Sequence, residues 1–593
     1  MGKELFKNIP SKVGDLVKDV RNGRIGLPDL QRPFVWRDNK VRELFDSMLK
    51  GYPIGYIMLW ESPADYESKK SSIGDNSKTY EEPKELVIDG QQRLTALVAA
   101  MFAVKVKDKN FADREIKISY NPLTREFAVW SQAYEKDTEW ISRISDVFLA
   151  KEDNSISSLR RHFIKEANEG RSKKELPLLT DEEEDRIEDN INALLNLSDY
   201  SLPTLEISYT ADEEDVADIF VRVNSGGQSL TEDNFIQTLI SVYENETSNK
   251  INAFAAASRV PAANTSYNTL LAIEPSHLIR MAVGVGFKRA RLRYAYMLLR
   301  GKNLETGKFS DEVRHENLQI FKDALDKVMN LNNWHSFINI VAEAGYISDK
   351  LIASSNAIVF SYVLYLIAKY DYKLDAAQLK KCTSKWFFMS TITYFYTGST
   401  ESEVEKQFAD LRDVHTAAEF IAYIDRVIET HFTDDYFSLT LPNELNSAAA
   451  ISPAWYGYVA AQIVLNTPML FSNTPVSKYF ILGSSGTKNA IDKHHIFPKN
   501  YLTGIGFTSD RDRNQIANFT YLDYATNIEI SDKAPQDYVS HYRQKLGEDG
   551  YYKACKEHAL PENFEHMEYA DFLSQRRLLI AQIIRKAYEQ LCE

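Results

Sequence analysis

The sequence is poor in cysteine. Its 593 residues include only three, Cys382, Cys555 and Cys592. Three widely separated cysteines cannot form a disulfide framework or a four-thiolate zinc site. A chain of this length buries enough apolar surface to fold without such cross-links. The low cysteine content is typical of a reducing compartment, and we expect a cytoplasmic protein.

Long hydrophobic runs are also missing. The most apolar segment, residues 358–368, is interrupted by Ser361 and by tyrosines, whereas a membrane-spanning helix needs about 20 mainly apolar residues. The first residues, MGKELFKNIPSKVGDLVKD, are polar and lack the apolar stretch of a signal peptide. We therefore expect neither secretion nor a membrane partner.

The sequence has no excess of positive charge. Its 84 acidic residues outnumber its 70 Lys and Arg residues, which gives a formal net charge of -14. This balance argues against a protein that coats nucleic acid nonspecifically, but not against a locally basic DNA site. Hydrophobic residues at 44% and charged residues at 26% are typical of globular proteins and exclude disorder of the whole chain.

The length predicts two to four domains, and the residue pattern changes twice along the chain. The first part mixes strand and helix signals, and the middle part has apolar residues at helical spacing almost throughout. We predict an α+β multidomain fold with boundaries at residues 1–240, 241–440 and 441–593.

Hydrophobic periodicity and turn residues also locate single elements. The acidic run 181–189 and the polar segment 62–83 are interpreted as solvated loops or helix faces, although an acidic run can also mimic nucleic acid. The aromatic cluster in 386–396 is interpreted as core, with a base-stacking platform as the alternative. The predicted strands are 85–88, 117–120, 126–130 and 204–209, and the predicted helices include 94–104, 351–370, 386–396 and 417–431.

The carboxyl-terminal third contains IDKHHIFPKNYL at 491–502 and RNQIANFTYLDYATNIEISDKAPQDY at 513–538. Hydrolysis of a phosphodiester needs a hard cation and a base that deprotonates water. Imidazole suits the base, and an asparagine oxygen and a histidine nitrogen can share a Mg²⁺-type ion. The alternative is a surface turn in which the asparagines serve as turn and cap residues. The residues of interest are His494, His495, Asn518, Asn527 and Lys533.

The two adjacent histidines set a geometric condition. Neighbouring residues of a regular strand leave it on opposite faces, so His494 and His495 cannot both face one ion there. The motif can act only if the strand ends or kinks at this point, and Pro498 is compatible with that.

The order of these residues resembles the ββα-metal, or HNH, nuclease motif, and within it the nuclease half of GmrSD-type restriction enzymes. The resemblance covers residues 491–538. It implies that His495 is the general base and that His494 and Asn527 are metal ligands. It also implies that Asn518 is the central asparagine that ties the loop together and orients the histidine.

One departure from the family pattern lies beside the implied base. Many members carry Asp or Glu where this chain has His494, and Asp492 is nearby. Lys533 fits either a phosphate contact or a solvated lysine. The implied cofactor of this half is one Mg²⁺ or Mn²⁺ ion.

The amino-terminal third contains QRPFVW at 31–36 and IDGQQRLT at 88–95. The second string places Gly90 at a strand-to-helix turn and Arg93 about one helical turn later. Free N–H groups at a helix start and one guanidinium form an anion site suited to phosphate. Asp89 could hold a cation or orient a water molecule. The alternative for this string is an ordinary turn followed by a helix cap.

These strings, with GYPIG at 51–55 and FVRVNSGGQSLTEDNF at 220–235, resemble the ParB/sulfiredoxin-like half of GmrSD-type proteins over residues 9–239. The resemblance implies that residues 1–240 bind and hydrolyse NTP, with ATP or GTP expected. Asp89 is the implied catalytic residue of this half. The implied nucleotide-binding residues are Gln31, Arg32, Asp89, Gly90, Gln91, Gln92, Arg93, Arg222 and Asn224.

Together the two halves imply a nucleotide-regulated, metal-dependent DNA endonuclease. The length favours the BrxU-like group, which restricts phage DNA with modified cytosine, and the SspE-like, phosphorothioate-sensing group is the next choice. Expected partners are double-stranded modified phage DNA, NTP and a second copy of the chain. The alternatives are an NTP-dependent sensor of modified DNA with an inactive HNH domain, a phosphorothioate-sensing nickase, and a phosphotransferase that uses the amino-terminal pocket.

Overall fold

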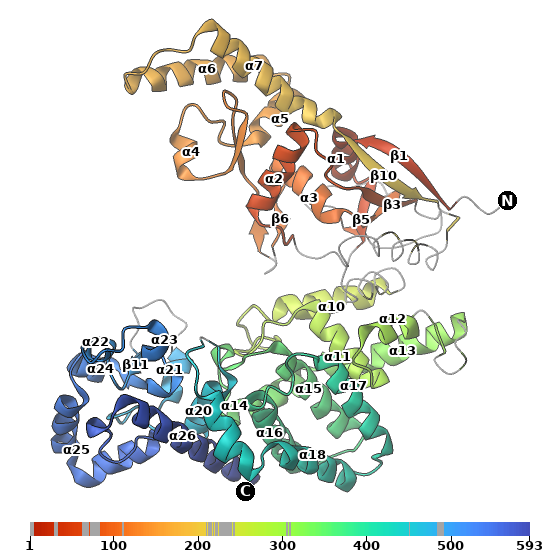
Figure 1. Cartoon of the computed structure of the whole chain (residues 1–593). Helices are drawn as coiled ribbons and strands as arrows, with labels where there is room; N and C mark the ends of the chain where they lie inside the picture. The colour runs from red at the N-terminus through yellow and green to blue at the C-terminus, as the bar shows by residue number, and fades with distance from the viewer. Residues whose placement is uncertain are drawn as a thin grey trace. The chain divides into compact units, whose positions relative to one another are not determined.

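The computed structural model of the chain describes residues 5–28, 34–61, 70–71, 84–108, 112–208, 210–211, 216, 219, 223, 236, 240, 244–299, 301–303, 306, 310–449, 451–482 and 491–593. It divides into two compact units, Met1–Ala256 and Ala257–Glu593. The first unit combines a sheet with helices, and the second unit is mainly helical. The chain therefore has an α+β multidomain fold (Figure 1).

The first unit is built on a mixed six-stranded sheet with the order β1-β10-β3-β5-β2-β4. The β10–β3 and β2–β5 pairs are parallel, and the β1–β10, β3–β5 and β2–β4 pairs are antiparallel. The strands are β1 (Phe6–Lys12), β2 (Ile25–Pro28), β3 (Ile57–Glu61), β4 (Lys70–Ser71), β5 (Glu85–Asp89) and β10 (Ser201–Ile207).

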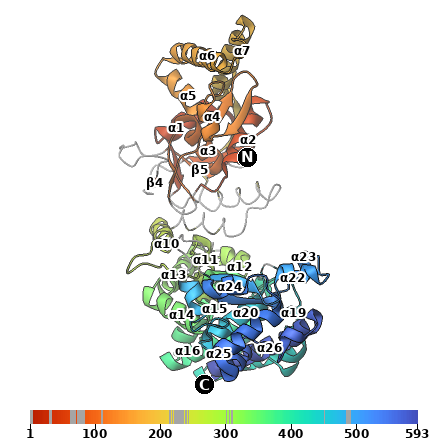
Figure 2. The same ribbon diagram turned by 90° about the vertical axis from the view of Figure 1, so that its left-hand side faces the viewer.

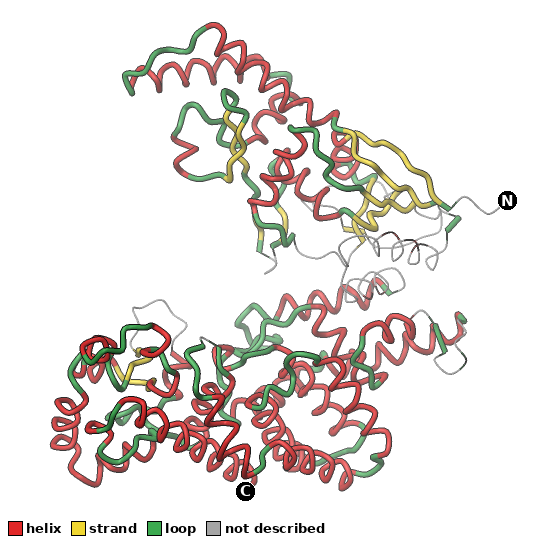
Figure 3. Tube along the Cα trace, in the orientation of Figure 1, coloured by secondary structure: helices red, strands yellow, loops and turns green. Residues whose placement is uncertain are grey.

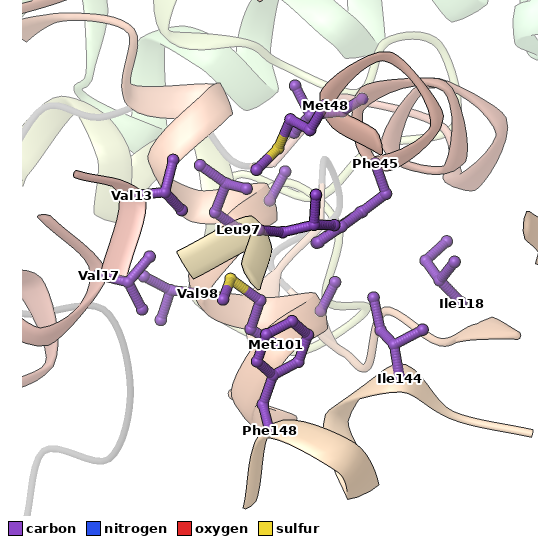
Figure 4. Packing of buried hydrophobic residues seen from close by; sticks show 14 of the residues in the cluster. Val13, Val17, Phe45, Met48, Leu97, Val98, Met101, Ile118, Ile144 and Phe148 are labelled. Carbon is purple, nitrogen blue, oxygen red and sulfur yellow. The ribbon is translucent and has the colours of Figure 1, made fainter. Parts of the chain in front are cut away.

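Alternating side chains on the central strands separate two apolar layers, as a strand buried on both faces requires. Ile57 and Leu59 belong to the large core under the helices, whereas Met58 and Trp60 belong to a smaller cluster on the other face. Figure 4 shows the large core, to which Leu97, Val98 and Met101 of α3 contribute. The strand that ends at Asp89 and the helix that follows it are therefore held rigidly.

The helices of this unit among the described residues are α1 (Val13–Arg21), α2 (Asp38–Leu49), α3 (Gln91–Phe102), α4 (Gln132–Lys136), α5 (Ile144–Glu152), α6 (Ile156–Lys173), α7 (Asp181–Leu195), η1 (Asn196–Asp199) and α10 (Asn245–Ala257), which ends at the boundary between the units. Two small hairpins accompany them, β6 (Val106–Lys107) with β7 (Asp113–Arg114), and β8 (Ile118–Asn121) with β9 (Glu126–Val129). Helices α6 and α7 lie side by side in both views (Figure 1 and Figure 2).

The second unit is mainly helical (Figure 3). Its first part contains α11 (Pro275–Phe287), α12 (Leu292–Leu299), α13 (Asp311–Val328), α14 (Leu331–Glu343), η2 (Asp349–Leu351), α15 (Ser355–Tyr370), α16 (Ala376–Ile392), α17 (Thr400–Asp410), η3 (Leu411–Asp413), α18 (Ala417–His431), η4 (Tyr436–Thr440) and α19 (Leu441–Glu444).

The remainder of the second unit carries one two-stranded hairpin among its described residues. It contains α20 (Pro453–Val464), α21 (Ser477–Leu482), β11 (Ile491–His495), α22 (Lys499–Gly504), α23 (Asp510–Arg513), η5 (Ile516–Asn518), β12 (Phe519–Asp523), α24 (Tyr524–Ile530), α25 (Pro535–Glu557), η6 (Phe564–His566) and α26 (Tyr569–Cys592). Helix α26 packs on α16, α19 and α20, so this part and the helical middle share one unit. The three-domain division stays a prediction.

The predicted elements are largely present. The strand at 85–88, the helix at 94–104, the 117–130 hairpin and the helix at 417–431 are confirmed by β5, α3, β8–β9 and α18. The acidic run 181–189 forms the first turns of α7 and is confirmed as a helix face. In the aromatic cluster, Trp386, Phe387, Phe388 and Tyr396 are buried core, but Tyr394 is exposed.

Two predicted elements need a correction. The helix predicted over 386–396 ends at Ile392, because α16 spans Ala376–Ile392 and Tyr394 has a positive φ. The strand predicted at 204–209 begins earlier, at Ser201, and ends at Ile207, because its pairing with β1 starts at the Lys12–Ser201 pair. Among the described residues, no helix is long and apolar enough to cross a membrane.

Candidate functional site

The paired histidines lie on a short antiparallel hairpin. Strands β11 and β12 pair His494 with Thr520 and His495 with Phe519. Strand β11 ends at His495, where the sequence condition required a strand end. Residues leave a strand on alternate faces, so His494 and His495 can approach one phosphate only around this end.

Asn518 fixes the chain where the strand ends. Its side chain is fully buried, its Oδ1 accepts the Phe497 N–H at 2.8 Å, and its Nδ2 donates to the Phe497 carbonyl at 3.0 Å. The Asn518 carbonyl also accepts the Ile496 N–H at 2.8 Å. A buried amide that satisfies both backbone groups of one residue fixes that residue, since leaving either group unpaired costs about 1–3 kcal/mol. These hydrogen bonds tie Asn518 to the segment after the strand, and the role that the resemblance implies for Asn518 in orienting His495 stays a prediction.

His495 is oriented by a residue that the sequence analysis missed. Its Nε2 lies 3.1 Å from Asn514 Oδ1, and its ring meets Phe519 edge-on with ring centroids 4.7 Å apart. An amide oxygen only accepts, so this hydrogen bond places a proton on Nε2 and makes Nδ1 the proton-accepting atom of the neutral ring. Asn514 stands among polar turn residues, where an asparagine in sequence is indistinguishable from a cap.

Helix α24 follows the hairpin directly and carries Asn527, which is half-buried. Asp523 caps this helix through a 2.8 Å hydrogen bond from the Thr526 N–H to its Oδ1. Burial raises the pKa of Asp523, but hydrogen bonds from Ser472 and Thr526 outweigh it, so the pKa lies below its ordinary value. A charged cap at the helix start stabilises α24 and so fixes the position of Asn527.

The side chains near the paired histidines include possible ligands for a catalytic cation. Among the described residues, no group of three or more His, Cys, Asp or Glu side chains could hold a metal ion. His494 and Asn527 provide an imidazole nitrogen and an amide oxygen from elements that pack together, β11 and α24. Two such donors fit a hard ion that keeps water and phosphate oxygens as its other ligands.

A buried polar layer supports the hairpin from below. Arg576 of α26 is fully buried, and its Nη1 donates to the Ala517 carbonyl at 2.5 Å and its Nη2 to the His558 carbonyl at 3.3 Å. His558 donates from Nε2 to the Pro468 carbonyl at 2.8 Å, and its Nδ1 lies 3.2 Å from the Thr520 hydroxyl. Burial lowers the pKa of His558 to about 4, so the ring is neutral near pH 7.

The other predicted residues of this half lie at the edges of the site. Lys533 is exposed just after α24, where its backbone N–H bonds to Ile530, and no contact fixes a phosphate role for it. Asp492 pairs with Leu522 in the ladder, two residues before His494.

The second candidate site lies at the turn from β5 to α3. Gly90 adopts φ +86° there, a conformation that favours glycine. A Cβ at this position would lie 2.4 Å from Ile57 Cδ1 and 3.0 Å from the Tyr56 carbonyl. The turn thus presents the start of α3 at the edge of the sheet, where the Gly90 carbonyl accepts the N–H groups of Arg93 and Leu94, each at 3.0 Å.

Arg93 lies one turn into α3 and points back to this edge. Its Nη1 donates to the Tyr56 carbonyl, and a Cβ on Gly55 would lie 2.7 Å from its Nη2. Burial lowers the pKa of Arg93, and the neighbouring Asp89 carboxylate opposes that shift. The Tyr56 hydroxyl donates to Asp89, and burial together with that carboxylate raises the pKa of Tyr56 above its ordinary value.

The structure therefore brings Asp89, Gly90 and Arg93 together and adds Tyr56 and Gly55, which the sequence analysis did not select. Gln92 Oε1 accepts the Val35 N–H at 3.0 Å, which ties the QRPFVW segment to α3. Gln91 begins the helix. Gln31, Arg32, Arg222 and Asn224 lie outside the described residues.

The first comparison with known proteins concerns this amino-terminal part. Residues 13–241 match the family model of the GmrSD restriction endonuclease, N-terminal domain. The match includes β5, α3 and the turn between them. Residues 13–241 are therefore similar to the N-terminal domain of GmrSD restriction endonucleases, and the match ends well before the carboxyl-terminal hairpin.

The second comparison covers both units. An uncharacterized protein of Methanocaldococcus jannaschii is 25% identical over 556 residues, which is 88% of this chain and 85% of that protein. The two-unit chain is thus similar as a whole to an archaeal protein of comparable length.

Proposed function

We propose that the protein is a nucleotide-regulated, metal-dependent DNA endonuclease that restricts phage DNA with modified cytosine. It acts in the cytoplasm, and its substrate is double-stranded. Cutting both strands with one nuclease site per chain calls for two copies, so a homodimer is part of the proposal.

The observation that carries the proposal is the pair of hydrogen bonds between the Asn518 side chain and the Phe497 backbone, which fixes His495 at the end of strand β11. The hairpin is followed at once by a capped helix with Asn527. A ββα order with a base at the strand end and a donor on the helix suits phosphodiester hydrolysis. The family match of the amino-terminal part supports the restriction role independently.

In the proposed reaction, His495 Nδ1 takes a proton from the attacking water. Asn514 keeps the proton on Nε2, so Nδ1 is the nitrogen that faces the water in every catalytic cycle. A Mg²⁺ or Mn²⁺ ion held by His494 and Asn527 supplies, when bound, positive charge for the phosphate oxygens. Asn518 prevents the loop from moving as charge develops.

In the first unit, the start of α3 and the Arg93 guanidinium bind nucleotide phosphates, and Asp89 orients the attacking water or a cation for NTP hydrolysis. A separate nucleotide site can regulate cleavage, and an unregulated nuclease would attack the host chromosome. ATP or GTP is the expected nucleotide.

The test is a cleavage assay on matched phage DNAs that contain cytosine, hydroxymethylcytosine, glucosylated hydroxymethylcytosine or phosphorothioate linkages. Each DNA is incubated with Mg²⁺ or Mn²⁺, with and without each NTP. The His495→Ala variant should lose cleavage by at least about 100-fold and retain NTP hydrolysis, because the base belongs to one site only. His566→Ala, at an exposed histidine of the same unit, is the matched control.

The outcomes separate the alternatives. Cleavage of only the modified-cytosine DNAs supports the proposal, and cleavage of only phosphorothioate DNA identifies the phosphorothioate-sensing nickase. Tight NTP-dependent DNA binding without cleavage under any condition identifies the sensor of modified DNA with an inactive HNH domain. The presence of His494 where many family members carry Asp or Glu favours this alternative. A phosphorylated product in place of free phosphate identifies the phosphotransferase. Undiminished cutting by His495→Ala would refute the site.

A further inference from the structure

Helices α6 and α7 form a two-helix hairpin whose two members differ in charge. Helix α6 contains five Arg and Lys against two Glu, whereas α7 contains seven Asp and Glu against one Arg. The two lie side by side, so a basic surface and an acidic surface adjoin (Figure 1 and Figure 2). We call this pair the charged hairpin.

Most of this charge is not used inside the hairpin. Arg171 pairs with Glu139 at 2.6 Å and with Glu183 at 3.5 Å, and Asn168 donates to Glu184 at 3.2 Å. The contacts with Glu183 and Glu184 involve the inner edge of α7, and Glu139 lies outside both helices. The carboxylates of the outer face are exposed, and none enters an ion pair among the described residues: Asp181, Glu182, Asp185, Glu188 and Asp189.

The outer face of α6 presents the opposite charge. Arg161, Lys165 and Lys173 are exposed, and the pairing of Lys165 is with Glu169 on its own helix at 3.8 Å. Exposed pairs of this kind contribute little to stability, so both faces can exchange partners at small cost.

The connection between the helices adds apolar surface. Leu176 is 50% exposed and Leu178 is 57% exposed, while the neighbouring Leu179 is buried and anchors the turn. Two exposed leucines within three residues, flanked by charge, have the composition of a small interface centre with a polar rim.

We propose that the charged hairpin is where two copies of this chain associate, with α6 of one copy against α7 of the other. In a two-fold dimer each contact occurs twice, so a surface must be complementary to itself. A hairpin with one basic and one acidic helix meets that requirement, because the two-fold operation can place each basic face on an acidic face. The exposed leucines meet near the axis. This surface locates the homodimer of the proposed function but does not depend on the nuclease assignment.

Reciprocal charge reversal tests the proposal. One variant reverses α6 (Arg161→Glu, Lys165→Glu, Lys173→Glu) and a second reverses α7 (Glu182→Lys, Asp185→Lys, Asp189→Lys). Each variant alone opposes like charges at both contacts, so its dimer dissociation constant should rise by roughly 100-fold or more. Mixed together, the two variants oppose unlike charges at both contacts and should dimerise again.

Association is measured by analytical ultracentrifugation of the full chain, with and without NTP and without DNA or metal. The wild type should sediment at twice the 67.9 kDa chain mass and dissociate as salt rises. Reversal of exposed lysines of the other unit, Lys350→Glu, Lys381→Glu and Lys406→Glu, should leave the dimer intact. A second probe, Leu178→Asp, should weaken it without a charge change on either helix.

Three results would overturn the proposal. They are a wild type that is monomeric with and without NTP, reversed variants that each still dimerise, and a mixture that fails to restore the dimer while both variants are folded. Because no DNA is present, failure here leaves the nuclease assignment standing, and failure of the cleavage assay leaves the dimer surface standing.

Discussion

At the scale of single residues, Asn514 determines which nitrogen of His495, the proposed base, can accept a proton. Replacing it by alanine removes the acceptor for Nε2–H, and we expect kcat of cleavage to fall by about 10–100-fold. In Asn514→Asp a carboxylate accepts the same proton and stabilises the charged ring, so it raises the pKa of His495. The acidic limb of the pH–rate profile should then move to higher pH by about 1–2 units.

The pH profile distinguishes this positioning role from a merely structural one. Asn500→Ala, at an exposed asparagine that bonds to Asp532, serves as the control and should change neither rate nor profile. An unshifted profile in Asn514→Asp, with normal folding, would show that Asn514 does not act through His495.

His558 gives the carboxyl-terminal unit a pH-dependent stability. Its pKa is lowered to about 4 in the folded protein, against an ordinary value of 6.5 in the unfolded chain. The unfolded chain therefore binds the extra proton between these values, so stability is complete above pH 6.5 and is lost as pH falls to about 4. The loss from this group is about 3 kcal/mol.

Urea titrations between about pH 7 and pH 4 measure this loss as the slope of the free energy of unfolding against pH. His558→Gln cannot take up that proton, so its slope should be shallower by one proton than that of the wild type. Parallel slopes for the two proteins would contradict the assignment.

Sequence reasoning reached some of these residues and missed others for a physical reason. Asn518 was selected because the order of the motif residues resembles that of a known family; its hydrogen bonds to Phe497 are observed, and its role in a reaction stays a prediction. Asn514, Arg576 and His558 escaped because their importance comes from contacts, and two of the three lie far along the chain from the hairpin.

At the scale of elements, the turn from β5 to α3 is a tightly constrained part of the proposed nucleotide site. Gly90→Ala would place a Cβ against Ile57 at a positive φ, at a cost of about 1–3 kcal/mol. We expect the variant to lose NTP binding by at least about tenfold, because the start of α3 must shift. Isothermal titration with NTP and a thermal unfolding scan measure the two effects.

Gly398→Ala is the matched control for this turn. Gly398 has φ +73°, but a Cβ there meets nothing within 4 Å, so the variant carries the backbone cost alone. Equal NTP binding by Gly90→Ala and the wild type would show that the turn does not form the phosphate site.

Helices and strands were easier to predict than the tertiary contacts between them. The strand at β5, the hairpin β8–β9 and the helix α18 follow from local periodicity and turn residues. What periodicity cannot give is that α26 supports η5, since that contact joins Arg576 to Ala517 over a long sequence separation. The beginning of β10 at Ser201 was likewise set by its pairing with β1.

At the scale of the whole molecule, the two candidate sites belong to different compact units, so their chemistry should be separable by substitution. Asp89→Asn keeps the shape of the side chain but removes its charge, and we expect NTP hydrolysis to fall by about 100-fold or more. Cleavage by this variant should no longer respond to NTP. His495→Ala should lose DNA cleavage and retain NTP hydrolysis.

Parallel NTPase and cleavage assays on the two variants check this separation, with circular dichroism to confirm folding. Loss of both activities in both variants would mean that one site performs both reactions, and the two-site assignment would then fall. The fold class and the similarity of residues 13–241 to the GmrSD N-terminal domain were predictable from sequence. The two-unit division was not, because α26 joins the hairpin region to the helical middle only through tertiary packing.

The support of the hairpin by Arg576 has a consequence for synthesis in the cell. The ribosome adds this arginine about eighty residues after His495, which at 5–20 residues per second is a delay of roughly 4–16 s. Until then the nascent chain contains both histidines but not the cation that holds the Ala517 carbonyl. The amino-terminal unit is already complete by that time. Translation order therefore completes the proposed nucleotide-binding unit first, and the proposed nuclease site gains its Arg576 support only at the end of synthesis.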